Sequence, residues 1–82
     1  MKRLVMITVD GCKVCDRLRP IAKQNCDIKN INFIEYKSDS KESESYDING
    51  IPQFILEESG TVVLHGVGEM GLQFCKIVPT KY

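Results

Sequence analysis

The sequence predicts an α/β fold in which a four-stranded mixed sheet is flanked by helices, in the order β-α-β-(α)-β-β-α. Three observations lead to this fold class. Residues 4–9 form a short apolar run, residues 12–26 show an amphipathic helical pattern, and residues 53–64 hold two apolar runs around a turn. A chain of 82 residues is too short to fill two separate cores, so we expect residues 1–82 to form a single domain.

The first half of the chain predicts two parallel strands joined by a helix. Residues 2–9 are rich in β-branched side chains, as a buried strand is, and Asp10-Gly11 ends this strand. The following helix carries its apolar side chains at helical spacing, namely Val14, Leu18, Ile21 and Ala22. Pro20 lies inside the helix and is expected to kink it. Residues 30–36 form the second strand, which a right-handed crossover makes parallel to the first.

The polar stretch of residues 38–45 has two alternative interpretations of equal weight. Asp39 and Glu42 have the spacing of a helix N-cap and its partner three residues on, which predicts a short surface helix. A solvated loop is the alternative.

The second half of the chain predicts a hairpin and a final helix. The runs at 53–56 and 61–64 make antiparallel strands, with Gly60 in the turn at positive φ. Residues 69–78 suit a helix that Pro79 stops. We expect helices on both faces of the sheet.

Charge and cysteine content narrow the function. Lys plus Arg and Asp plus Glu each number 11, so neither nucleic acid nor an anionic membrane is expected as a partner. The apolar run near the N-terminus is shorter than a signal-peptide core of ~7–15 residues, and no run approaches the ~18 residues of a membrane helix. We therefore expect a cytoplasmic protein. Four cysteines in that compartment suggest redox chemistry or metal binding rather than structural disulfides.

The Cys12-Lys13-Val14-Cys15 motif carries this chemistry, because it lies where a strand ends and a helix begins. Unpaired N–H groups at a helix N-terminus favour the thiolate, which is the reactive form of cysteine. Lys13 and Arg17 add positive charge, whereas Asp16 opposes it. Cys12 is the expected nucleophile and Cys15 the resolving thiol.

Zinc binding is the main alternative for this motif. A structural zinc site needs four ligands, and the remaining candidates Cys26, Cys75 and His65 lack any paired spacing. We therefore predict neither a metal nor a cofactor. Cys26 and Cys75 are expected to be small buried hydrophobic residues, and His65 a surface or hairpin residue.

The chain resembles the thioredoxin–glutaredoxin family over nearly its whole length. The active-site CxxC, Pro20-Ile21, Gly60 and Val67-Gly68 match in register, and residues 46–52 are similar to the segment that leads into the family's cis-proline. The resemblance implies a cis Ile51–Pro52 bond facing the cysteines, and a Pro52 that keeps metals off them. It also implies a substrate groove that is formed by Lys13, Val14, Ile51, Pro52, Val67 and Gly68.

The chain departs from both branches of the family. Compared with thioredoxins, the chain lacks the tryptophan before the CxxC. Met6 stands in place of the family's buried aspartate, and Glu35 or Lys37 is the candidate to take over the role of that aspartate. Compared with glutaredoxins, Val14 replaces a tyrosine, Gly50-Ile51-Pro52 replaces Thr-Val-Pro, and the glutathione-holding Gly-Gly is matched only loosely by residues 66–69.

The resemblance therefore implies a small protein thiol–disulfide oxidoreductase that is a monomer and reduces protein disulfides through Cys12 and Cys15. A flavin-dependent thioredoxin-type reductase or glutathione would be its electron donor. The first alternative is a glutathione-dependent glutaredoxin, and the second is a non-enzymatic interaction module on a thioredoxin scaffold.

Overall fold

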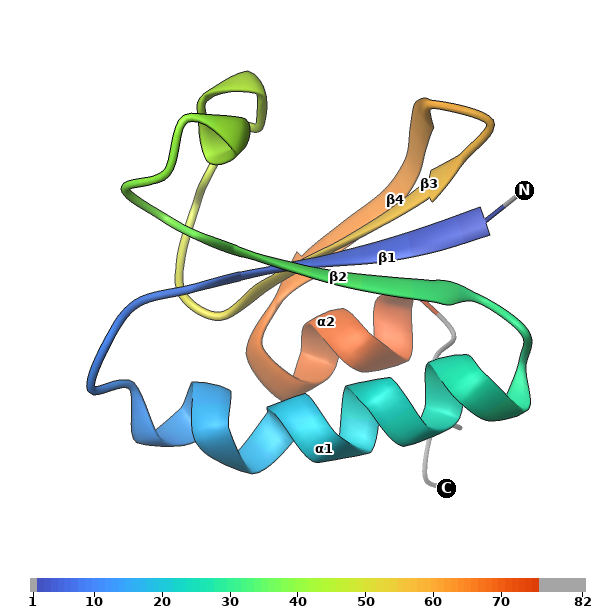
Figure 1. Cartoon of the computed structure of the whole chain (residues 1–82), viewed down its shortest axis with the longest axis horizontal. Coiled ribbons are helices and arrows are strands. Elements are labelled where there is room, and N and C mark those ends of the chain that lie inside the picture. Colours follow the sequence, from blue (N-terminus) through green and yellow to red (C-terminus); the bar gives the residue numbers. More distant parts are fainter. Residues whose placement is uncertain (1, 76–82) are drawn as a thin grey trace.

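The computed structural model describes residues 2–75. Four strands, two α-helices and one 3₁₀ helix follow one another along the chain (Figure 1). Their bounds are β1 (Lys2–Thr8), α1 (Lys13–Ile28), β2 (Asn32–Lys37), η1 (Glu42–Ser45), β3 (Gln53–Glu58), β4 (Thr61–Val67) and α2 (Gly68–Phe74). None of the helices within this range is long and apolar enough to cross a membrane.

The strands form one mixed sheet in the order β2-β1-β3-β4. β1 pairs in parallel with β2, where Val5 lies opposite Ile34, and antiparallel with β3, where Val5 lies opposite Ile55. β3 and β4 form the antiparallel hairpin. This topology confirms the fold class that the sequence predicts. The apolar run of β1 is explained by its central place, because its residues from Leu4 to Thr8 are buried.

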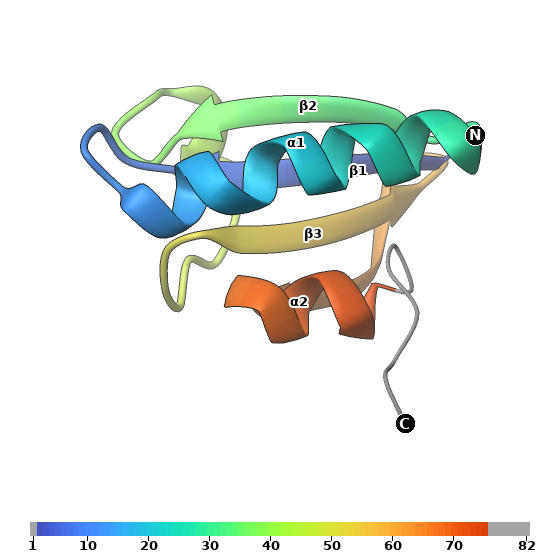
Figure 2. The same ribbon diagram turned by 90° about the horizontal axis from the view of Figure 1, so that it is seen from below.

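The two faces of the sheet are covered unequally. Both α-helices pack on one face, α1 across β1 and β2 and α2 beside β3 and β4 (Figures 1 and 2). Among the described residues, the opposite face carries only η1 and the segment that follows it (Figure 1). There Tyr46 and Ile48 pack on a small cluster of Val5, Ile7 and Ile55. Helices therefore lie on both faces, as expected, but the second face has a single 3₁₀ turn.

Helix α1 runs further than the sequence indicates, to Ile28. Asn30 then takes a left-handed conformation with φ of 61°, and the Ile31 N–H donates to the Cys26 carbonyl at 2.8 Å. This pattern satisfies the last carbonyls of a helix and turns the chain away from the helix axis. As a consequence β2 begins at Asn32, two residues later than predicted.

The polar stretch forms a helix, but Asp39 is not its cap. The N-cap position of η1 is Lys41, whose side chain makes no capping hydrogen bond. The hydroxyl of buried Ser43 instead donates to the carbonyls of Ser38 and Ser40, at 2.9 and 2.8 Å. A buried serine therefore holds this turn together, and the predicted capping by Asp39 is wrong.

The hairpin turn confirms the positive φ expected for Gly60. Ser59 and Gly60 have φ of 54° and 83°, which suits a two-residue turn between twisted strands. α2 begins at Gly68 and is capped by Cys75, so it is shorter than predicted. Val78 and Pro79, where the helix was expected to stop, lie outside the described residues.

Candidate functional site

The Cys12–Cys15 pair lies at the junction of β1 and α1. After β1 the chain turns at Gly11, whose φ of +80° is one that a side chain would strain. Cys12 is the N-cap residue of α1, and its Sγ accepts a hydrogen bond from the Cys15 N–H at 3.1 Å. The two cysteines form a disulfide with their Cα atoms 5.2 Å apart. In this arrangement Cys12 Sγ meets the N–H groups and the positive end of the helix dipole.

The two sulfur atoms differ in access. Cys12 is half-buried, whereas Cys15 is fully buried at 0% exposure. Cys15 belongs to the apolar cluster between the sheet and the helices, together with Met6 and Leu18. A large reactant therefore reaches Cys12 first and cannot meet Cys15 directly.

Glu35 lies on β2 beside α1, and its carboxylate is fully engaged. Arg19 donates to both of its oxygens, at 2.7 and 2.9 Å, and the Thr8 hydroxyl donates to one of them at 2.8 Å. These hydrogen bonds, chiefly those from Arg19, lower the pKa of Glu35. Lys37 pairs with Asp10 at 3.2 Å and with Glu35 at 3.7 Å. Glu35 is therefore a weak base, which argues against its replacing the aspartate for which Met6 stands.

The segment before β3 is bound to the start of α2. The Ile51–Pro52 peptide bond is cis, and the Pro52 carbonyl accepts a hydrogen bond from the Gly68 N–H at 2.7 Å. Gly50 packs so closely on Val67 that a Cβ there would lie 2.8 Å from Val67 Cγ1. A larger residue at this position would therefore require the Val67 side chain to shift.

The sequence-predicted site residues gather at one end of the sheet. The start of α1, the segment before β3 and the start of α2 all lie there (Figure 1). Cys12 and Ile51 pack against the same core cluster, which contains Cys15. Val14 and Val67 are 42% and 41% exposed. Lys13 is exposed too, and Arg17 pairs with Glu69 across α1 and α2 at 4.0 Å.

The other two cysteines lie in the core. Cys26 and Cys75 are each 1% exposed, which confirms the expectation of small buried hydrophobic residues. Burial raises the pKa of each thiol to about 11. The Cys75 thiol lies 3.8 Å from the Phe54 carbonyl, to which it donates.

His65 is exposed on β4, on the sheet face opposite α1, which fits the surface position expected of it. Within residues 2–75, no group of three or more His, Cys, Asp or Glu side chains is placed to hold a metal ion.

Several solved structures share the fold of this chain. Oxidised thioredoxin from Plasmodium falciparum matches with a TM-score of 0.74 and 21% identity, over 88% of this chain and 74% of its own. A mutant thioredoxin from Halobacterium salinarum matches with 0.73 and 19%, over 95% and 78%. Fasciola hepatica thioredoxin matches with 0.71 and 20%, over 82% and 67%. The chain has the thioredoxin fold. No protein-family model and no curated protein matches the sequence.

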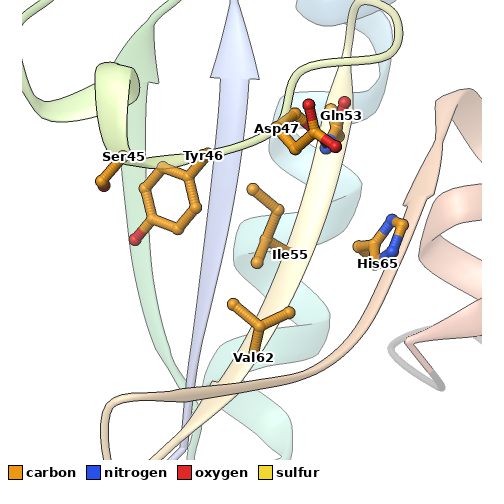
Figure 3. Close-up of a pocket in the computed structure, with 7 residues that line it drawn as sticks. All are labelled: Ser45, Tyr46, Asp47, Gln53, Ile55, Val62 and His65. Carbon is orange, nitrogen blue, oxygen red and sulfur yellow. Dashed lines mark hydrogen bonds between the residues drawn. The ribbon is translucent and has the colours of Figure 1, made fainter.

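Gln53 is a buried polar residue of this thioredoxin fold that the sequence did not single out. Gln53, the first residue of β3, is 1% exposed and borders a shallow depression on the face opposite α1 (Figure 3). Its partners are backbone groups of the segment before Pro52. In the sequence Gln53 reads as a polar residue at a strand end, and no spacing rule marks it. Its place directly after Pro52 was the only available signal.

Proposed function

We propose that this chain is a small protein thiol–disulfide oxidoreductase in which Cys12 is the nucleophile and Cys15 the resolving thiol. One observation carries the proposal. Cys12 caps the start of α1 through its Sγ and is half-buried, while its partner Cys15 lies fully buried within disulfide distance. A helix N-terminus favours the thiolate of the outer cysteine, and the inner cysteine is shielded from every reactant except a disulfide formed at Cys12.

The reaction proceeds in two exchanges. The Cys12 thiolate attacks one sulfur of a substrate disulfide, forms a mixed disulfide and releases the other substrate sulfur as a thiolate, which takes up a proton. The Cys15 thiol loses its proton to water and attacks Cys12 Sγ. The mixed disulfide breaks, the second substrate thiolate leaves, and a Cys12–Cys15 disulfide remains. Two electrons have passed from the protein to the substrate.

The apolar surface beside Cys12 supports a protein substrate. Exposed Val14 and Val67 flank the site, and the Ile51 backbone lies in the segment that precedes β3. An extended peptide can add to such a segment as a strand, while side-chain contacts with the apolar residues strengthen the binding. Lys13, Pro52 and Gly68 complete this proposed groove.

A separate reductant must restore the dithiol. A flavin-dependent thioredoxin-type reductase is the donor that we propose, and glutathione is the alternative. The two are separated by supplying each in turn to the oxidised protein and following the return of free thiols. The chain itself uses side chains alone for the exchange, so the proposal requires no cofactor.

The test compares variants in the reduction of insulin disulfides by dithiothreitol, followed as turbidity. The wild-type chain is expected to accelerate the reaction, and Cys12→Ser to lose this acceleration completely. Cys26→Ala is the matched control, since its thiol lies in the core away from the proposed groove, and it should retain activity. If the wild-type chain gives no acceleration, or if Cys12→Ser remains active, the oxidoreductase proposal is wrong, and the interaction module gains support.

A further inference from the structure

Gln53 is a buried amide with both of its polar atoms satisfied. Its Oε1 accepts a hydrogen bond from the Asn49 N–H at 2.7 Å, and its Nε2 donates to the Asp47 carbonyl at 2.9 Å. The side chain is 1% exposed and lies with Asp47 at one end of the depression on the sheet face opposite α1 (Figure 3). Because unsatisfied buried polar groups are costly, this geometry favours one position of the Asp47–Asn49 backbone.

The segment between Asp47 and Pro52 is thus fixed at three places. Gln53 holds its first half, Gly50 rests on Val67, and the Pro52 carbonyl accepts from the Gly68 N–H at 2.7 Å. Ile51 lies between these tethers. Among residues 2–75, neither the N–H nor the carbonyl of Ile51 has a backbone hydrogen-bond partner. The three tethers therefore hold the backbone at Ile51 in place while its N–H and carbonyl stay available for hydrogen bonding.

We propose that Gln53 is a positioning residue, whose amide holds the Asp47–Asn49 backbone so that Ile51 presents its N–H and carbonyl to a peptide substrate beside Cys12. This inference rests on the proposed function. A segment that already has its bound conformation loses less conformational entropy when the substrate binds, so the substrate binds more tightly. The benefit is limited to substrates with a peptide backbone, since a small disulfide makes no such pairing.

The test replaces Gln53 by methionine, which has a similar length but makes neither hydrogen bond. Gln53→Met is expected to raise KM for insulin disulfides by about tenfold, with kcat changed much less. The rate of reaction with the small disulfide 5,5′-dithiobis(2-nitrobenzoate) should stay at the wild-type value. Gln53→Glu keeps the acceptor for the Asn49 N–H and should give an intermediate KM.

Ser43→Ala is the matched control for stability. Ser43 is equally buried and donates from its hydroxyl to backbone carbonyls outside the tethered segment. It belongs to η1, which lies on the same side of the sheet (Figure 1). Ser43→Ala should lower the unfolding temperature without raising KM. If Gln53→Met does not fold, the comparison of Gln53→Glu with the wild-type chain decides.

Three outcomes would overturn the inference. The first is an unchanged KM for insulin disulfides in Gln53→Met and Gln53→Glu. The second is an equal loss with the protein and the small disulfide, which would indicate a general structural role. The third is the same rise in KM in Ser43→Ala. In each case an active wild-type chain leaves the proposed function standing, whereas an inactive wild-type chain would refute both.

Discussion

The chain holds two pairs of cysteines in very different settings. Cys15, Cys26 and Cys75 are all at most 1% exposed and belong to one core cluster, so burial alone does not separate the pairs. The difference lies in Cys12, which is half-buried and caps α1 through its sulfur atom. A single thiol at the start of a helix therefore distinguishes the pair that we propose to be reactive from two hydrophobic core residues.

The largest expected effect is in the alkylation rate of the reduced protein. Cys26 and Cys75 have pKa values of about 11, so roughly one thiol in 10⁴ of each is ionised at pH 7. Cysteines at helix N-termini have pKa values of ~3.5–7.5. The Cys12 thiolate is the weaker nucleophile, which offsets part of this ratio, but the core thiols are also only 1% exposed. Cys12 should therefore react with iodoacetamide at least ~10²-fold faster than either core cysteine. Timed labelling followed by peptide mass spectrometry measures this ratio.

The pH dependence sharpens the same comparison. A cysteine at a helix N-terminus is already a thiolate near neutral pH, so the labelling rate of Cys12 should level off as the pH rises. The core cysteines should react about tenfold faster for each unit of pH up to their pKa. Equal labelling of Cys12 and Cys26 at pH 7 in the folded protein would remove the distinction between the pairs.

The position of the CxxC motif in the fold could be predicted from the sequence, because the strand before it and the helix after it are recognised from local patterns. The central apolar strand and the Gly60 turn were predictable for the same reason. The end of α1 was missed, although Asn30 offered a signal, because asparagine is after glycine the residue that most often takes the left-handed conformation at a helix end. The turn held by Ser43 could not be predicted either, because nothing in this polar stretch of the sequence distinguishes the buried serine from the exposed ones.

Tertiary partners were the least predictable part of the site. The sequence suggests Glu35 as a base near Cys15, but Arg19, which lies in α1, occupies its carboxylate. The role of Gln53 depends likewise on where the backbone of Asp47 and Asn49 passes. Such pairings join segments that come together only when the sheet has formed, and no periodic pattern in the sequence predicts them.

A smaller effect should appear in stability. Under reducing conditions, Cys26→Ala should lower the free energy of unfolding by about 1–2 kcal/mol, because it leaves a gap in a packed core. Cys12→Ser should change it by less than about 0.5 kcal/mol, because serine is a good N-cap residue. Urea denaturation of both variants measures the difference. A larger loss in Cys12→Ser than in Cys26→Ala would contradict these assignments.

The smallest expected effect concerns the Arg19–Glu35 pair between α1 and β2. Glu35→Gln should cost about 1 kcal/mol at pH 7, as expected for a partly exposed bidentate pair. The folded-state pKa of Glu35 is lowered, so its contribution is present above its unfolded value of about 4.3. It is lost as the pH falls through the folded value.

Urea denaturation of the wild type and Glu35→Gln over a pH series tests this pair. The two free energies of unfolding should converge in acid. A constant difference at every pH would show that Glu35 contributes through packing rather than charge.

The most direct test of the account is a redox titration of the whole chain. The protein is equilibrated in graded mixtures of reduced and oxidised glutathione, quenched in acid and analysed by mass spectrometry. We predict a reversible loss of two hydrogen atoms, located in a Cys12–Cys15 disulfide, while Cys26 and Cys75 keep their thiols. A chain that stays fully reduced at every ratio, or that gains only a glutathione adduct at Cys12, would contradict the two-cysteine mechanism.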